Sequence, residues 1–256
     1  MYVMVVSLAF DQSRREKISS VMNDLNIEFP FVDAIYGRDL SKEEKETIPT
    51  QIFEKRCKHK PSDAVLGCTL SHIKAYEIML EKGLEWTCIL EDDVILDEKF
   101  GQFISEINEG KLEQNTLYIL GGQDGLRYRH KVVFNFFKNK ILGGQLFKKV
   151  SYGHGYVVRS CCYLASKNIV KNIIDELKID FFAMDEWKYL MRKNVFSNMY
   201  FSDLVHHPLD LSDSWIEKER RSGIKNKKTT KSKNRILISR MYWYVRRGIM
   251  GFVFWK

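Results

Sequence analysis

The sequence lacks several patterns that mark familiar protein classes. Its five cysteines form no Cys-x-x-Cys pair, which argues against a zinc ribbon or a disulfide scaffold. Only four prolines and fifteen glycines occur in 256 residues, so the composition is not that of a linker or a fibrous chain. Hydrophobic residues make up 45% of the chain, which is enough for the core of a large α/β domain. We therefore expect a cytoplasmic protein with reduced cysteines.

Long hydrophobic runs are also missing. No stretch reaches the roughly 18 uninterrupted apolar residues of a membrane-spanning helix. The longest candidate, residues 236–255, is interrupted by three arginines. The apolar first ten residues follow no basic segment, so we expect no signal peptide.

Acidic residues are scarce at the C-terminal end. Residues 217–256 hold 13 Lys and Arg against two Glu, a net charge of +11, whereas the first 216 residues carry a net charge of −3. We therefore predict a folded domain at residues 1–216 and a basic tail at residues 217–256. Read as a helix, residues 235–256 place apolar side chains on one arc and arginines on the opposite arc. This pattern predicts contact with an anionic inner-membrane surface, and packing on the protein's own core is the alternative.

Short apolar runs alternate with helical patterns along the first 120 residues. Strands are predicted at residues 2–8, 28–34, 86–90 and 116–120, with helices at residues 13–25, 69–82 and 97–109. This alternation predicts an α/β fold with a mostly parallel central sheet. Ligands bind such sheets beyond the carboxyl ends of the strands, where this sequence places polar residues. After residue 125 the pattern is weaker, with a strand within residues 155–165 and a helix starting at residue 181.

Three adjacent carboxylates, Glu91, Asp92 and Asp93, directly follow the third predicted strand. In an extended segment Glu91 and Asp93 face the same side. Adjacent carboxylates repel each other unless a cation lies between them, and their hard oxygens suit Mg²⁺ or Mn²⁺. A solvated loop that caps the next helix is the other interpretation.

Two further polar pairs are weaker candidates. His206 or His207 could complete a metal shell from the far half of the chain, although surface histidine pairs are more often not ligands. Asp185 follows an apolar segment that can raise a carboxyl pKa and suit a general base. Alternatively, Asp185 and Glu186 complement the dipole at the start of a helix.

Two motifs together resemble glycosyltransferase family 25. Residues 67–72 read GCTLSH, and about twenty residues later residues 89–94 read ILEDDV. The family contains bacterial lipooligosaccharide glycosyltransferases and relatives among collagen galactosyltransferases. Segments 6–8 with Arg14-Arg15, 32–37, 155–158 and 184–185 are similar to the family as well, so that the resemblance covers about residues 1–215. One departure is the residue before the Gly-Cys pair, where the family often has Glu and this chain has Leu66.

The resemblance implies a GT-A type, Rossmann-like nucleotide-binding fold and an inverting transfer. The donor is a UDP-sugar, most often UDP-galactose, and the acceptor is a hydroxyl group of a lipooligosaccharide core. Glu91 and Asp93 match the metal-binding positions, for Mn²⁺ or Mg²⁺, with His207 or His206 as a third ligand. Asp185 is the expected base, and Asp92 is a second candidate catalytic residue. The residues expected to line the donor site are Ser7, Arg14, Asp33, Gly67, Ser71 and His72.

Two other functions compete with transfer. An acidic triplet at a sheet edge suits a metal-dependent phosphohydrolase as well. A basic, aromatic tail also suits a nucleic-acid binder, but that function leaves the triplet without a role. We therefore expect no nucleic-acid partner.

Overall fold

The computed structural model describes residues 1–210, and the predictions for residues 217–256 lie outside them. The strands are β1 (Tyr2–Ser7), β2 (Phe31–Asp33), β3 (Trp86–Glu91), β4 (Thr116–Gly121), β5 (Val133–Leu142), β6 (Gln145–Tyr152), β7 (Cys162–Ser166) and β8 (Asn198–Val205). The α-helices are α1 (Gln12–Asp24), α2 (Lys42–Thr47), α3 (Gln51–Cys57), α4 (Asp63–Glu81), α5 (Glu98–Glu106), α6 (Lys167–Ile179) and α7 (Trp187–Arg192). Short 3₁₀ turns include η1 (Gly37–Asp39) and η4 (His154–Tyr156).

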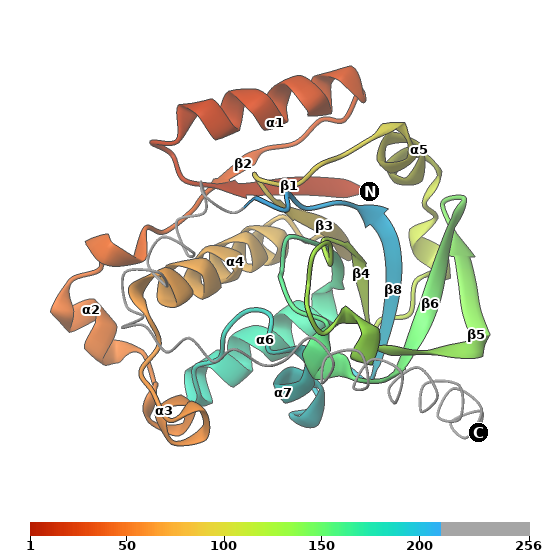
Figure 1. Ribbon diagram of the computed structural model, residues 1–256. Helices are drawn as coiled ribbons and strands as arrows, with labels where there is room; N and C mark the ends of the chain where they lie inside the picture. The colour runs from red at the N-terminus through yellow and green to blue at the C-terminus, as the bar shows by residue number, and fades with distance from the viewer. Residues whose placement is uncertain (211–256) are drawn as a thin grey trace.

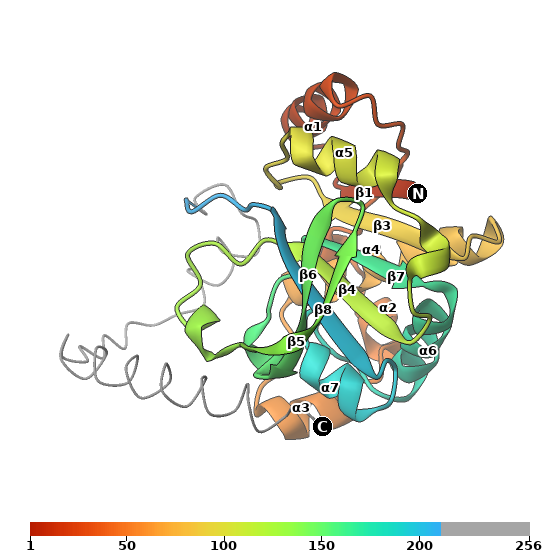
Figure 2. The same cartoon turned by 90° about the vertical axis from the view of Figure 1, so that its right-hand side faces the viewer.

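The strands form one sheet in the order β2-β1-β3-β7-β4-β8-β6-β5 (Figures 1 and 2). The pairings of β1 with β2, β1 with β3 and β4 with β8 are parallel. The other four of the seven pairings are antiparallel, so the prediction of a mostly parallel sheet is wrong.

The antiparallel pairings have a simple origin in the second half of the chain. The strand–helix alternation holds up to β4, but residues 133–152 then form the hairpin β5–β6 instead of a crossover helix. Residues 153–161 then lead the chain to the edge where β3 and β4 end, so β7 starts there and runs against both. The carboxyl ends of β1, β3, β4 and β8 nevertheless meet at one edge, where β7 begins.

Helices cover both faces of the first half of the sheet. Met4 and Val6 of β1 belong to the apolar cluster on the side of α4 and α6, whereas Val3 and Val5 belong to the cluster on the side of α1 and α5. In Figure 1 these two helix layers lie below and above β1. Because successive side chains of a strand face opposite sides, burial on both sides explains the uninterrupted apolar runs.

Helix α4 begins six residues before the predicted start at residue 69. Ser62 caps it by accepting a hydrogen bond from the Val65 amide, at 3.3 Å. The longer helix brings Gly67 against η1, where a Cβ on Gly67 would lie 2.5 Å from the Ile35 carbonyl oxygen and 2.7 Å from the Gly37 nitrogen. Glycine at residue 67 thus lets the loop after β2 pack directly on α4.

Candidate active site

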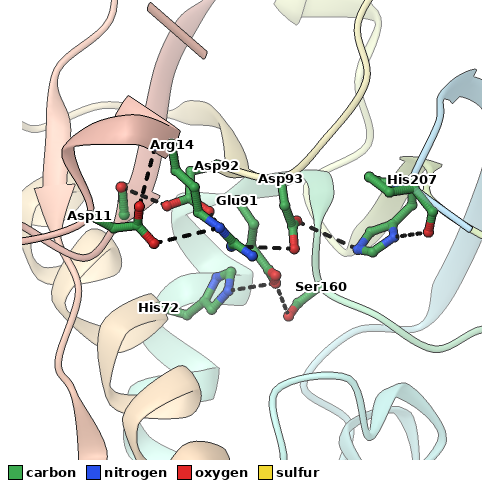
Figure 3. A network of polar contacts seen from close by, with 10 residues as sticks. Asp11, Arg14, His72, Glu91, Asp92, Asp93, Ser160 and His207 are labelled. Carbon is green, nitrogen blue, oxygen red and sulfur yellow. Dashed lines mark hydrogen bonds and ion pairs between the residues drawn. The ribbon is translucent and has the colours of Figure 1, made fainter. Parts of the chain in front are cut away.

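A cavity of about 480 Å³ lies at the edge where the parallel strands end. Its wall combines the ends of β1 and β3, the first turns of α4, the segment before β7, the segment before α7, and His207 after β8. All three residues of the acidic run line it. The sequence therefore predicted the right edge of the sheet, and Figure 3 shows the polar contacts there.

Asp92 is bound by the protein on both oxygens. The Ser7 hydroxyl donates to its Oδ2 at 2.6 Å, and Arg14 Nη1 donates to its Oδ1 at 2.9 Å. Burial raises the pKa of Asp92 and outweighs the opposite effects of Ser7 and Arg14. Since both oxygens are in use, Asp92 joins β3 to β1 and α1. These contacts suit a residue that holds Ser7 and Arg14 in position better than they suit the catalytic role predicted for Asp92.

Asp93 is held less completely. Its Oδ2 lies 3.6 Å from Arg14 Nη1 and its Oδ1 lies 3.5 Å from His207 Nε2. Among the described residues this buried Oδ1 accepts no hydrogen bond. Burial acts to raise the pKa of Asp93, but the facing His207 and Arg14 hold that pKa below its usual value. In turn Asp93 holds the pKa of His207 above its usual value, despite the burial of the imidazole.

Glu91 turns to a different set of partners. Its Oε1 accepts a hydrogen bond from Ser160 Oγ at 2.7 Å and lies 3.4 Å from His72 Nε2. The predicted trio of Glu91, Asp93 and His207 is therefore split, with Glu91 on one side and the Asp93–His207 pair on the other (Figure 3). The reason is local: β3 ends at Glu91, and the turn that follows cancels the strand alternation on which the prediction relied.

The two neighbouring histidines have different surroundings. His207 lines the cavity, whereas the exposed His206 ring lies 3.3 Å from Asp124. The His207 amide also donates to Asp124 Oδ2, at 3.0 Å. Burial acts to raise the pKa of Asp124, but these two contacts keep it below its usual value. The structure thus selects His207 from the predicted pair and adds Asp124 as its support, which no sequence motif indicated.

Asp185 lines the cavity from the loop before α7 rather than from within a helix. Its Oδ2 accepts a hydrogen bond from the Arg159 amide at 2.9 Å. Burial raises the pKa of Asp185, with smaller contributions from the charges of Glu91 and Glu186. A carboxyl group with a raised pKa in a cavity wall is suited to take up a proton.

Arg159 is a cavity residue that the sequence analysis missed. Its φ of 68° lies in the left-handed region, which is uncommon for a residue other than glycine and often marks a functional site. Its guanidinium donates to the Gly122 and Asp124 carbonyl oxygens, at 2.7 and 3.1 Å. The sequence analysis also missed the neighbouring Ser160. The one signal for Arg159 and Ser160 in the sequence is that they directly follow segment 155–158, which is similar to the family.

The residues expected to line the donor site divide into two groups. Ser7, Arg14, Ser71 and His72 line the cavity. Gly67 and Asp33 are not among the lining residues: Gly67 packs against η1, and the exposed Asp33 forms an ion pair with Arg15 at 2.6 Å.

Known proteins show which family the chain is similar to. The model of glycosyltransferase family 25, described as an LPS biosynthesis protein family, matches residues 1–187. A Haemophilus influenzae protein named "Putative glycosyltransferase" is 34% identical over 43% of this chain and 41% of its own length. The lipooligosaccharide biosynthesis protein lic2B of Haemophilus influenzae is 27% identical over 66% of this chain and 60% of its own length. The chain thus spans less than two thirds of the length of these relatives.

Among solved structures, a glycosyltransferase involved in glycosylation of the major capsid of PBCV-1 aligns with 86% of this chain and 100% of its own. Its TM-score is 0.42 at 12% identity. Within residues 1–210, no helix has the length and apolar character needed to cross a membrane.

Proposed function

The chain belongs to glycosyltransferase family 25, and from that premise we propose that it transfers galactose from UDP-galactose to a hydroxyl group of a lipooligosaccharide core. The observation that carries the proposal is the convergence of Asp93, His207 and Asp185 on one cavity at the carboxyl edge of the sheet. The cavity volume of about 480 Å³ lies within the range of small-molecule sites.

In the proposed reaction Asp185 acts as the base. The acceptor hydroxyl oxygen attacks the anomeric carbon of the donor, and the bond from that carbon to the diphosphate oxygen breaks. The hydroxyl proton passes to Asp185, whose burial favours the protonated form. A single displacement of this kind inverts the anomeric carbon. The Arg159 amide keeps the Asp185 carboxyl group in place.

The residues around Asp93 fit the divalent cation that the family implies. The buried Asp93 Oδ1, which accepts no hydrogen bond from residues 1–210, faces the His207 imidazole. Carboxylate oxygen and imidazole nitrogen are donors that Mn²⁺ accepts. We propose that Asp93 and His207 hold this ion, while Glu91 keeps its contacts with Ser160 and His72. Such an ion stabilises the charge of a leaving diphosphate.

The strand order is also the basis for a finer proposal on the fold. The parallel group β2-β1-β3 is followed in the sheet by the antiparallel β7, and the acidic run lies at the end of β3, an order that supports a nucleotide-binding half. We propose that this is a GT-A type arrangement within a catalytic domain at residues 1–216.

A membrane-bound acceptor would suit the basic segment at residues 217–256, which lies outside the described residues. We propose that its net charge of +11 attracts anionic lipid. Deletion of residues 217–256 should abolish sedimentation with anionic vesicles while activity on a soluble acceptor remains. Unchanged sedimentation of the truncated chain would contradict this proposal.

The decisive experiment measures UDP release from a panel of UDP-sugars, with Mn²⁺ or with EDTA, and with or without a lactose-core acceptor. We expect release from UDP-galactose that needs Mn²⁺ and increases with the acceptor. A matched reaction with phosphate esters tests the phosphohydrolase. Ester cleavage without an acceptor, together with no release from any UDP-sugar, would overturn the proposal.

A further inference from the structure

Three metal-ligating side chains meet in the cavity wall beside the proposed site of the catalytic cation. Cys68 and His72 lie one turn apart on α4, and Glu91 ends the neighbouring β3. Their sulfur, imidazole nitrogen and carboxylate oxygen all lie within 4.8 Å of one another. His72 is almost fully buried, with a relative exposure of 1%, and all three residues line the cavity.

The far side of the His72 ring is already oriented. His72 Nδ1 lies 2.8 Å from the Tyr163 hydroxyl, which lies 2.6 Å from the Tyr76 hydroxyl. The Tyr76 hydroxyl lies 3.7 Å from the thioether of Met184, which can only accept. A chain that donates from His72 Nδ1 toward Met184 leaves Nε2 with a free lone pair. Metal-binding histidines are commonly held by such a hydrogen bond from their other nitrogen.

The alternative is a chain in the opposite direction, in which His72 Nε2 donates to Glu91. The Nε2 to Oε1 distance of 3.4 Å is long for that hydrogen bond. It is the separation expected for two ligands of one ion: atoms about 2.1 Å from a tetrahedral Zn²⁺ lie about 3.4 Å apart. The Ser160 hydroxyl meanwhile holds the same Glu91 oxygen at 2.7 Å.

We propose that Cys68, His72 and Glu91 bind a thiophilic divalent cation of the Zn²⁺ class, with its fourth position open to the cavity. A thiolate favours Zn²⁺ over Mg²⁺ or Mn²⁺, so this site differs in chemistry from the Asp93–His207 pair. Binding requires loss of the Cys68 thiol proton to solvent as the sulfur–metal bond forms. Three protein ligands and one open position are typical of zinc sites that exchange a water or substrate group.

The test is a titration of the full, reduced and metal-free chain with Co²⁺, which reports thiolate coordination by absorption. We expect a sulfur-to-cobalt charge-transfer band that saturates with one Co²⁺ per chain at this site, and displacement of that band by Zn²⁺. Cys68→Ser should lose the band, and Cys57→Ser should keep it, because Cys57 is a half-buried cysteine of α3 outside the cluster. Circular dichroism shows whether each variant is folded.

Tyr163→Phe provides a second reading. It keeps all three ligands but removes the partner of His72 Nδ1, so we expect Co²⁺ affinity to fall by about tenfold. The proposal is overturned by a wild-type chain without the charge-transfer band, or by a band that persists in Cys68→Ser. These experiments measure Co²⁺ binding and not transfer activity. Their outcome is therefore independent of whether the proposed glycosyltransferase reaction is correct.

Discussion

Two neighbouring residues of the acidic run, Asp92 and Asp93, differ in how completely the protein satisfies their carboxylates. Toward β1, Asp92 has a partner on each oxygen. Toward β8, Asp93 has a buried oxygen to which no described residue donates a hydrogen bond, although His207 lies 3.5 Å away. A satisfied carboxylate stabilises the fold, whereas an unsatisfied buried one costs free energy that a ligand can recover. We therefore expect Asp92, on the β1 side, to matter for stability and Asp93, on the β8 side, to matter for activity.

The largest expected effect is the loss of transfer activity in the variant Asp93→Ala. We expect a folded protein whose transfer rate falls by about 10³-fold or more, because the cation that stabilises the leaving diphosphate loses its main carboxylate. Initial rates with saturating Mn²⁺ measure the effect. Asp175→Asn is the control, since Asp175 is an exposed acid on α6 that pairs with Lys178. A normal rate in Asp93→Ala would remove Asp93 from the metal site.

Asp185→Asn is expected to lower the transfer rate by about 10²- to 10⁴-fold while UDP binding persists. The wild-type rate should rise with pH as Asp185 loses its proton, with a midpoint above the usual carboxyl pKa, because burial raises the pKa of Asp185. A pH–rate profile and calorimetric UDP titration measure both. Loss of UDP binding would place Asp185 in the donor site instead.

The raised pKa of Asp185 also affects the stability of the fold. The folded chain binds the Asp185 proton more tightly than the unfolded chain, since the folded pKa is raised. Its stabilisation is complete below the unfolded pKa and is lost as pH rises through the folded pKa. At a pH above the folded pKa the ionised Asp185 therefore destabilises the fold, and there Asp185→Asn should melt at a higher temperature than the wild type.

On the β1 side the effect should appear in stability. Asp92→Ala removes the contacts with Ser7 and Arg14 and leaves both without this partner, so we expect the free energy of unfolding to fall by about 2–3 kcal/mol. Urea unfolding measures it. Asp33→Ala is the matched control, because the exposed Asp33 pairs with Arg15, which lies on α1 like Arg14, and it should cost less than about 1 kcal/mol. Equal losses in both variants would contradict the special role of Asp92.

The sequence predicted the elements of this site better than their mutual geometry. The apolar runs located β1, β3 and β4, and the polar residues after them indicated the ligand edge. The motif resemblance led to Asp93 and Asp185, and both line the cavity. These predictions depend on the local order of apolar and polar residues, which can be read directly from the sequence.

What failed depends on contacts between distant segments. The antiparallel direction of β7 depends on the edge at which residues 153–161 return the chain to the sheet, and the irregular pairing of β5 with β6 hides their strand period. The support of His207 by Asp124 joins residues 83 positions apart. No local pattern carries such information, so these features had to come from the three-dimensional structure.

The smallest expected effect is on the β8 side and concerns Asp124, which supports His207. Asp124→Ala removes the acceptor of the His207 amide, so the loop that carries His207 is less well held. We expect the Mn²⁺ concentration for half-maximal activity to rise by about tenfold, as for lost supporting contacts of other metal ligands. His206→Gln is the control, because it removes the exposed imidazole near Asp124 and leaves the His207 amide contact in place. If both variants raise the Mn²⁺ requirement equally, the contact of the His206 imidazole with Asp124 matters more than the position of His207. If neither does, Asp124 does not support the metal site.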